Sequence, residues 1–308
     1  MIEEQGVSGV VYDVQRMSTC DGPGIRTTVF LKGCYLNCEW CHNPEGKRRY
    51  PEVLPYINNC TGCRNCIAVC PTNAIIMKED KAPWIDKSLC LTCLECVRAC
   101  KENALIWWGR ILTVTEVMDE VEQDKEFYGN SGGGMTVSGG EPMVQPLFVY
   151  NLMKEAKNRG ISTALDTCGY AAWPDLERVL EFTDLVLFDL KNMDSQQHKD
   201  YSGCGNEVII ENARRIAEKG IKMRIRVPII PGRNDSVKCL EETAKFAQSL
   251  GDVVLGVDLL SYHPYAGAKY KTFGMDYEFP IGVGMDEEKI RPVIDLFLNY
   301  VEEVTVGG

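Results

Sequence analysis

The sequence predicts an α/β protein whose parallel sheet has outer helices and is interrupted by a cysteine-rich insert. From Thr113 onward, apolar strand patterns alternate with amphipathic helix patterns, which is typical of a parallel sheet covered by helices. Two more strand patterns precede the insert. A full eight-stranded barrel typically takes about 250 residues, and the chain outside the insert has slightly too few regular units for one, so an incomplete barrel is expected. An open doubly wound sheet would show the same alternation.

The composition is that of a globular protein with reduced thiols. The chain has 308 residues, of which 45% are hydrophobic, and this supports a sizeable core. Its net charge of -11 disfavours a nucleic-acid partner. There is no long apolar run and no export signal, so we expect no membrane contact and a cytoplasmic location. Fifteen cysteines then indicate metal sites, because disulfides persist mainly in oxidising compartments.

The first two expected strands, Val7 to Tyr12 and Arg26 to Lys32, enclose a turn. The turn residues Asp21, Gly22 and Pro23 give a tight backbone path, and Asp21 and Arg26 are expected as an exposed pair at its edges. A plain surface turn explains this pattern as well as a functional one does.

The loop after the second strand holds Cys34, Cys38 and Cys41 in a CxxxCxxC spacing. Three thiolates can hold three irons of a [4Fe-4S] cluster, which normally takes one cysteine on every iron. The remaining iron would be open to another ligand, and an open iron indicates chemistry rather than electron storage. A zinc site completed by His42 is the alternative, since three cysteines and one histidine form a known structural zinc set.

Residues 55–108 form an insert in which the cysteine pattern CxxCxxCxxxC occurs twice. This is the bacterial ferredoxin run, whose fourth cysteine ligates the other cluster. Zinc sites made of paired CxxC motifs would leave half of these cysteines unexplained. We therefore assign two [4Fe-4S] clusters, one on Cys60, Cys63, Cys66 and Cys100 and the other on Cys90, Cys93, Cys96 and Cys70. Residues 1–54 and 109–308 are expected to form the two parts of the barrel.

The alternating elements follow the insert in order. After a helix that begins at Thr113, strands are expected at Met135 to Ser138, Ser162 to Asp166, Leu185 to Asp189, Lys222 to Pro228, Val254 to Ser261 and Val304 to Val306. Further helices are expected at Leu147 to Arg159, Asp175 to Phe182, Asn206 to Lys219 and Ser236 to Leu250. His198 lies in a polar helical stretch and is expected to be exposed. The cysteines without a ligand assignment are interpreted as packing or exposed thiols, namely Cys20, Cys168, Cys204 and Cys239.

Polar residues follow several of these strands. Gly139 and Gly140 would let a small molecule touch the backbone, and Glu141 offers a carboxylate to an ammonium group. A tight βα turn is the competing interpretation of this motif. Asp166 and Asp189 close apolar strands, where an aspartate often caps the next helix or turn. By themselves, Lys191 would be a solvated lysine and His263 a structural histidine.

Two of these motifs together resemble the radical S-adenosylmethionine superfamily. They are the three-cysteine loop, with Trp40 before its last cysteine, and Gly139-Gly140-Glu141. The resemblance implies that S-adenosylmethionine binds the open iron through its aminocarboxylate group. It also implies that the glycine motif receives the amino group of this cofactor.

Longer motifs narrow the resemblance to the glycyl-radical-enzyme activating enzymes over nearly the whole chain. These motifs are the turn at 21–26, the segment 41–45, Asp166-Thr167-Cys168-Gly169, Asp189-Leu190-Lys191 and the double insert. The resemblance implies a partial (β/α)6 barrel with the cofactor across the C-terminal strand ends. It also implies an activity: the reduced cluster cleaves S-adenosylmethionine to methionine and a 5′-deoxyadenosyl radical, which removes a hydrogen atom from a glycine residue of a partner glycyl radical enzyme.

The same resemblance implies roles for single residues. The expected cofactor contacts are Trp40, Cys41, His42, Gly139, Gly140, Glu141, Asp166, Asp189, Leu190, Lys191 and His263, and a monovalent cation is expected near Asp166 and Asp189. The expected partner contacts are Asp21, Gly22, Pro23 and Arg26. Together with the cysteine-loop cluster, the insert gives three [4Fe-4S] clusters, and the insert clusters would relay electrons from a flavodoxin or ferredoxin. The protein is expected to act as a monomer.

Two other functions remain open. A radical S-adenosylmethionine enzyme that acts on a small molecule or matures a peptide would need the same cluster loop. A non-catalytic iron-sulfur electron carrier would need only the insert, and the open-iron trio and the long barrel pattern oppose it. The sequence does not identify the partner among the known glycyl radical enzymes.

Overall fold

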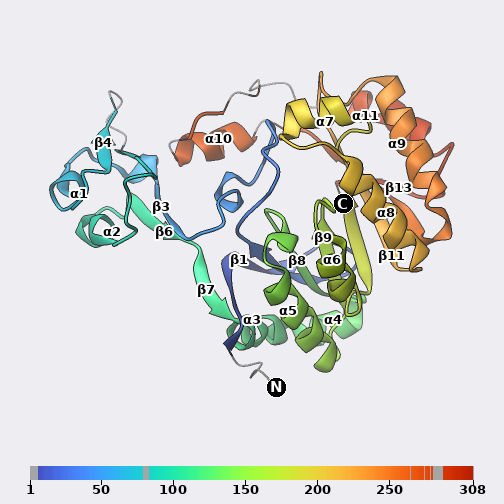
Figure 1. Cartoon of the computed structure of the whole chain (residues 1–308), viewed down its shortest axis with the longest axis horizontal. Helices are drawn as coiled ribbons and strands as arrows, with labels where there is room; N and C mark the ends of the chain where they lie inside the picture. The colour runs from blue at the N-terminus through green and yellow to red at the C-terminus, as the bar shows by residue number, and fades with distance from the viewer. Residues whose placement is uncertain are drawn as a thin grey trace.

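A computed structural model describes residues 6–78, 83–263, 265–273, 275–277, 279 and 287–307. Its main sheet has nine strands in the order β13-β12-β11-β10-β9-β8-β2-β1-β7 (Figure 1). The neighbours from β2 to β13 are parallel, and they are β2 (Arg26–Leu31), β8 (Gly134–Gly139), β9 (Thr163–Thr167), β10 (Leu185–Asp189), β11 (Lys222–Ile229), β12 (Val254–Ser261) and β13 (Val304–Val306). The predicted α/β fold with a mostly parallel central sheet is therefore confirmed.

The first strand departs from the parallel pattern. β1 (Ser8–Ser18) pairs antiparallel with β2, and β7 (Arg110–Thr113) pairs antiparallel with β1 at the edge of the sheet. The turn between β1 and β2 is short, and a parallel neighbour would need a crossover of a dozen or more residues. β1, which was counted among the strands of the expected barrel, is therefore not one of the parallel strands.

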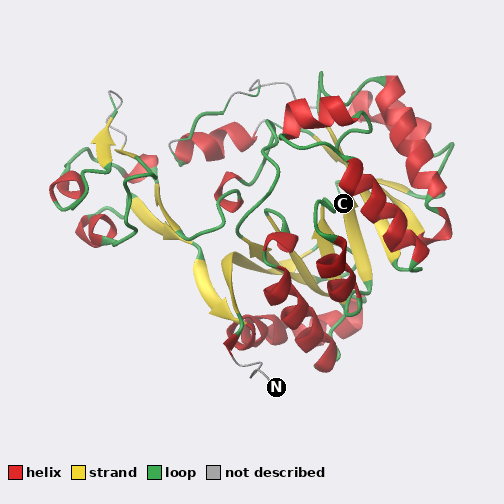
Figure 2. Cartoon of the chain, in the orientation of Figure 1, coloured by secondary structure: helices red, strands yellow, loops and turns green. Residues whose placement is uncertain are grey.

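Most of the helices lie outside the sheet and pack on it through one apolar face. In α3 (Val114–Val121), Thr113 and Glu116 form a capping box, and Val117 and Met118 are buried against the sheet. One exception is α10 (Tyr265–Thr272), which contacts the insert at Ile57–Asn59. Figure 2 shows the outer placement of most of the helices that follow α3. The helices after α3 are α4 (Lys125–Ser131), α5 (Pro146–Asn158), α6 (Trp173–Leu180), α7 (Ser195–Ser202), α8 (Glu207–Glu218), α9 (Val237–Ser249), α10 and α11 (Glu287–Phe297). Within the described ranges, no helix is long and apolar enough to cross a membrane.

The insert region has its own small sheets and its own core. β3 (Glu52–Pro55) pairs with β6 (Leu105–Trp108), and β4 (Ile75–Met77) pairs with β5 (Pro83–Ile85). The short helices are α1 (Asn65–Ala68) and α2 (Glu95–Ala99). Positive φ angles recur at equivalent places of the two cysteine runs, at Arg64 and Leu94 and again at Asn73 and Asn103. The two runs therefore share a backbone path as well as a cysteine spacing.

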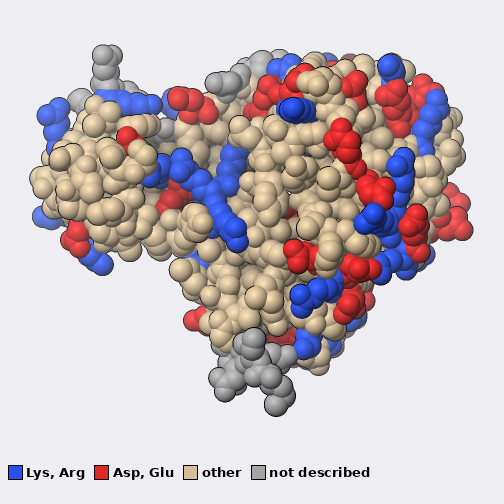
Figure 3. Space-filling model, in the orientation of Figure 1, with Lys and Arg blue, Asp and Glu red and all other residues tan. Residues whose placement is uncertain are grey.

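Charge is distributed unevenly over the face shown in Figure 3. Lys and Arg side chains are frequent over the insert and where it joins the main sheet, and Asp and Glu side chains are frequent over the opposite end. In the sequence, residues 55–108 contain six Lys and Arg and five Asp and Glu, so the net charge of -11 arises from the part of the chain outside the insert.

Candidate active site at the strand ends

A cavity of about 480 Å³ opens at the carboxyl ends of the parallel strands. Because parallel strands present these ends at one edge of a sheet, residues far apart in the sequence meet there. The lining contains most of the predicted site residues, namely Cys34, Cys38, Trp40, Cys41, His42, Gly139, Gly140, Asp166, Asp189, Lys191 and His263. Leu190 is not among them, because its side chain is buried behind the cavity wall.

The three-cysteine loop is held in place by α7. The backbone N–H of Asn37 donates to the carbonyl of Ser202 at 2.7 Å, and that of Glu39 donates to the carbonyl of Tyr201 at 3.1 Å. Arg233 adds an ion pair with Glu39 at 2.9 Å. These bonds replace regular secondary structure in a loop whose own residues form none. The prediction from sequence did not include this support.

The three cysteines of the loop are part of the cavity lining. Burial, and next the charge of Glu141, raise the pKa of Cys34 to about 12. Burial raises the pKa of Cys38 to about 11. Among the described residues, no group of three or more His, Cys, Asp or Glu side chains is arranged to hold a single metal ion.

The two glycines of the glycine motif allow a close approach between chain segments. Gly139 has φ +128°, and a Cβ atom there would lie 2.3 Å from the backbone nitrogen of Leu31. A Cβ atom on Gly140 would lie 2.2 Å from the carbonyl oxygen of Gly33 and 2.6 Å from that of Gly46. Any side chain would therefore separate β8 from β2 and from the cysteine loop.

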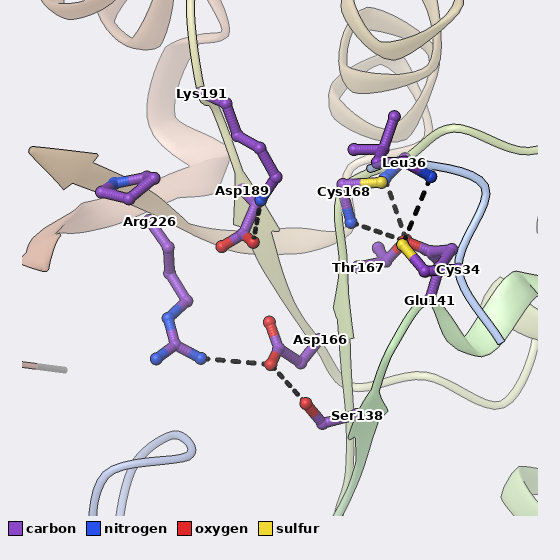
Figure 4. Close-up of polar contacts among 12 residues, drawn as sticks. Cys34, Leu36, Ser138, Glu141, Asp166, Thr167, Cys168, Asp189, Lys191 and Arg226 are labelled. Carbon is purple, nitrogen blue, oxygen red and sulfur yellow. Dashed lines mark hydrogen bonds and ion pairs between the residues drawn. The ribbon is translucent and has the colours of Figure 1, made fainter. Parts of the chain in front are cut away.

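Glu141 differs from the expectation. It is 1% exposed and is not part of the cavity lining. Its carboxylate accepts hydrogen bonds from the Thr167 hydroxyl at 2.7 Å and the Cys168 N–H at 2.8 Å (Figure 4). It also accepts one from the Met143 N–H at 3.0 Å. Burial raises the pKa of Glu141 against the opposing effect of these bonds. The expectation that this carboxylate is offered to an ammonium group is therefore corrected, because the carboxylate binds backbone and side-chain donors of the next strand end.

A wall of charged residues closes the other side of the cavity. Asp166 accepts a hydrogen bond from Ser138 at 2.6 Å and pairs with Arg226 at 3.3 Å, and Asp189 pairs with Lys191 at 2.6 Å (Figure 4). Burial raises the pKa of Asp166 to about 6, with Asp189 adding to the effect and Arg226 opposing it. The helices that follow begin at other caps, so the alternative in which these aspartates cap helices is wrong.

Arg226 was missed by the prediction, although the sequence contains a signal for it. Arg224 and Arg226 alternate in an otherwise apolar strand, and such spacing puts both on one face of β11. Arg226 lines the cavity, whereas Arg224 pairs with Asp258. Burial opposes the charge of Arg226, but Asp166 and Asp189 raise its pKa overall.

Two residues of the cavity lining and one residue of the neighbouring α10 hold buried polar atoms that have no hydrogen-bond partner in the described part of the chain. These atoms are Nε2 of His42, Nε of Arg226 and the hydroxyl of Tyr270. Leaving such a group unsatisfied costs about 1–3 kcal/mol, so a polar ligand would restore lost stability there. Burial, and next His263 and Lys269, lower the pKa of His42 to about 4. Thiols together with unpartnered polar atoms fit an iron-sulfur cluster and a polar cofactor.

Arg26 and His198 are buried, although both were expected to be exposed. Arg26 is 1% exposed and donates to the Thr136 hydroxyl at 2.6 Å and to the Met135 carbonyl at 2.8 Å. It therefore cannot form an exposed pair with Asp21, and a partner cannot reach its side chain. The expectation that His198 is exposed is also wrong, because it is 2% exposed and its Nδ1 lies 2.6 Å from the Cys204 carbonyl oxygen.

Comparison with known proteins identifies the class of enzyme. The family model of the radical SAM superfamily matches residues 83–247, a 4Fe-4S dicluster domain matches 59–105 and a 4Fe-4S single cluster domain matches 20–54. The structure of Streptococcus suis SuiB bound to its precursor peptide SuiA aligns with a TM-score of 0.55 at 13% identity, covering 89% of this chain and 46% of that chain. The radical SAM family model covers more than half of the chain, so this chain is a radical SAM enzyme. The SuiB structure shows the same fold.

Curated relatives define the family more closely. An isethionate sulfite-lyase activating enzyme of Nitratidesulfovibrio vulgaris is 42% identical, with 94% of this chain and 95% of the relative aligned. A (2S)-3-sulfopropanediol dehydratase activating enzyme of Klebsiella oxytoca is 36% identical over 97% and 96% of the two chains. A benzylsuccinate synthase activating enzyme of Thauera aromatica is 39% identical over 97% and 92%. The chain therefore belongs to the glycyl-radical-enzyme activating enzymes, and the predicted family is confirmed.

Proposed function

We propose that this chain activates one partner glycyl radical enzyme from the cavity at its strand ends. The observation that carries the proposal is that one cavity brings the Cys34, Cys38 and Cys41 loop against charged strand-end residues. When bound, a [4Fe-4S] cluster on these cysteines supplies an electron, and S-adenosylmethionine supplies the 5′-deoxyadenosyl radical that takes a hydrogen atom from a glycine of the partner.

The residues of the chain bind and orient the cofactor. The backbone of Gly139 and Gly140 is open to its amino group, and Trp40 and His42 line the side next to the cluster. Lys191 and Arg226 carry positive charge on the opposite wall, where they attract the carboxylate of the cofactor.

Asp166 and Asp189 offer carboxylate oxygens to a monovalent cation beside the cofactor. The Arg226 guanidinium already pairs with Asp166 at 3.3 Å, so Arg226 competes with the cation for this carboxylate. His263 completes the far side of the site, where its ring lies 4.7 Å from that of His42.

The architecture proposed for this activity has two parts. Residues 1–54 and 109–308 form a partial (β/α)6 barrel, and residues 55–108 form a ferredoxin-like insert with two further clusters, which gives three in total. The repeated backbone path of the two cysteine runs supports this assignment. The insert would receive electrons from a flavodoxin or ferredoxin and pass them to the cluster of the cysteine loop. The protein acts as a cytoplasmic monomer.

The partner would meet the turn at Asp21, Gly22 and Pro23. Pro23 is exposed, and the carboxylate of Asp21 is fixed by the Thr28 hydroxyl at 2.8 Å. Arg26 supports this turn from below, since its guanidinium donates to the Pro23 carbonyl at 3.3 Å.

The proposal is tested by electron paramagnetic resonance of the partner. Three of the relatives are named as activating enzymes of isethionate sulfite-lyase, so this lyase is the first partner to test, followed by the product of any neighbouring reading frame. We expect a glycyl-radical doublet only when the reconstituted chain, reductant and S-adenosylmethionine are all present. Cys38→Ala is the control and should give no doublet. Cleavage of S-adenosylmethionine without a doublet in any candidate partner would favour a small-molecule or peptide substrate, and no cleavage at all would exclude both enzyme functions.

A further inference from the structure

The hydroxyl of Tyr270 is a feature of the site that the proposed function leaves unexplained. Tyr270 belongs to α10 and is 5% exposed, and its hydroxyl has no hydrogen-bond partner among the described residues. A phenol in the interior normally finds a partner for its O–H group. The absence of one beside the cysteine loop indicates that the acceptor belongs to a group bound there.

The position of Tyr270 is fixed from several sides. On the preceding residue, the Lys269 ammonium donates to the Glu45 carboxylate at 2.8 Å, which ties α10 to the segment just after the cysteine loop. The Lys47 ammonium lies 5.6 Å from the centroid of the Tyr270 ring. The ring of Tyr277 lies 4.5 Å from that of Tyr270 on another side. The hydroxyl therefore has a defined direction and is not free to turn to solvent.

The neighbours of Tyr270 place it close to Cys41. Tyr277, whose ring contacts that of Tyr270, packs against the same apolar cluster as Cys41. The Lys269 ammonium also donates to the Asn43 side chain at 3.2 Å, two residues after Cys41. In agreement with this placement, burial and next the charge of Cys41 raise the pKa of Tyr270. The phenol thus lies near a thiol that is assigned to the cluster. A cysteine sulfur bound to iron carries negative charge and accepts hydrogen bonds, so the bound cluster would supply the acceptor that the hydroxyl lacks.

We propose that Tyr270 is a positioning residue that donates a hydrogen bond to the Cys41 sulfur of the cluster and thereby raises the reduction potential of that cluster. The proposal rests on the proposed function, because it needs a cluster on the cysteine loop. One electron enters the cluster from the external donor, and the proton stays on Tyr270. A hydrogen bond to a ligand sulfur stabilises the more negative, reduced form, so the cluster accepts this electron more readily.

The test compares the wild-type chain, Tyr270→Phe and Tyr265→Phe after reconstitution with iron and sulfide. Tyr265 is the matched control, since it lies on the same helix and is 75% exposed. The midpoint potential is followed by electron paramagnetic resonance for the one cluster whose signal changes when S-adenosylmethionine is added. At a fixed potential, we expect about a tenfold lower ratio of reduced to oxidised cluster in Tyr270→Phe, the effect of one hydrogen bond to a charged group. Tyr265→Phe should match the wild type.

Different outcomes separate this inference from the proposed function. A responsive cluster with the same potential in Tyr270→Phe and the wild type would overturn the role of Tyr270 and leave the proposed function intact. A wild-type chain without any responsive cluster would overturn both. Should Tyr270→Phe lose the cluster, Tyr270→Met is the second variant without a donor, and it should show the lowered ratio. Loss of the cluster from both variants would overturn the proposal in favour of a purely structural role.

Discussion

Buried polar residues stabilise the helix that holds the cysteine loop. His198 is the clearest case, because it lies on α7, whose last residues accept the backbone hydrogen bonds of the loop. With Nδ1 protonated, His198 donates to the Cys204 carbonyl, while its buried Nε2 has no partner in the described chain. A proton on Nε2 would therefore put a charge into the interior without an acceptor.

This arrangement predicts that acid weakens the folded state through His198. Burial lowers the pKa of His198 in the folded protein below its ordinary value. The unfolded chain then binds the extra proton first, so the stabilising contribution is full above about pH 6.5 and is lost as the pH falls below it. His198→Asn keeps a donor near the Cys204 carbonyl but cannot titrate.

The measurement is the thermal denaturation midpoint of the two chains between about pH 8 and pH 5. We expect the midpoint of the wild type to fall more steeply with acid than that of His198→Asn. Other groups, among them Asp166, also titrate in this interval, but they are common to both chains and cancel in the difference. Parallel curves for the two proteins would exclude His198 as the cause.

At the scale of elements, the contact between the end of β8 and the cysteine loop is backbone against backbone. The Gly140 N–H donates to the Leu31 carbonyl at 2.9 Å, and the Glu141 N–H donates to the Gly33 carbonyl at 2.7 Å. The glycine motif therefore positions the cysteine loop in addition to lining the cavity. This close backbone contact explains why neither Gly139 nor Gly140 has room for even a methyl group.

Gly140→Ala should consequently displace the cysteine loop. Its Cβ atom would lie 2.2 Å from the Gly33 carbonyl oxygen, a distance at which one of the two segments must move. We expect the variant to lose the cluster signal that responds to S-adenosylmethionine, with the iron of the insert retained. Gly129→Ala on α4 is the matched control, because a Cβ there has nothing within 4 Å. Iron analysis and electron paramagnetic resonance measure the result, and a normal responsive cluster in Gly140→Ala would contradict it.

The sequence predicted the regular elements well where local patterns decide them. β10, β12 and β13 have the expected bounds, because apolar runs between turn residues define buried strands. The antiparallel pairing of β1 was missed, since pairing direction depends on the strand's neighbours and not on its own pattern. α4, α10 and α11 were also missed. α10 has only three buried residues and lacks a strong apolar face, so its sequence gave little helical signal.

The candidate site was predicted to the extent that motifs encode it. The spacing of Cys34, Cys38 and Cys41 is local, so a single loop reveals it. Arg226 lines the cavity and Tyr270 lies near the cysteine loop, although both are far along the chain from that loop, so only the tertiary fold brings them there. Arg26 was placed on the surface because a turn is usually exposed, whereas its guanidinium satisfies carbonyl and hydroxyl oxygens inside the sheet.

For the whole molecule, a buried charge network joins the main sheet to the insert. Lys32, which follows β2 and precedes the cysteine loop, is fully buried, and its ammonium donates to Glu52 at 3.0 Å. Lys87 of the insert pairs with the other oxygen of Glu52 at 2.9 Å. Burial lowers the pKa of Lys32, and the charge of Glu52 opposes this effect. One carboxylate therefore holds cations from both parts of the chain.

Glu52→Gln should loosen this joint. Removing one partner from a buried ion pair leaves an uncompensated charge and typically costs about 3–5 kcal/mol. Glu95→Gln is the control, because its pair with Arg98 is exposed and such pairs contribute about 0–1 kcal/mol. Differential scanning calorimetry should show a lowered denaturation temperature for Glu52→Gln only, and hydrogen exchange should rise at β3 and β6, which flank the joint. Unchanged exchange in these strands would mean that contacts other than this carboxylate fix the insert to the main sheet.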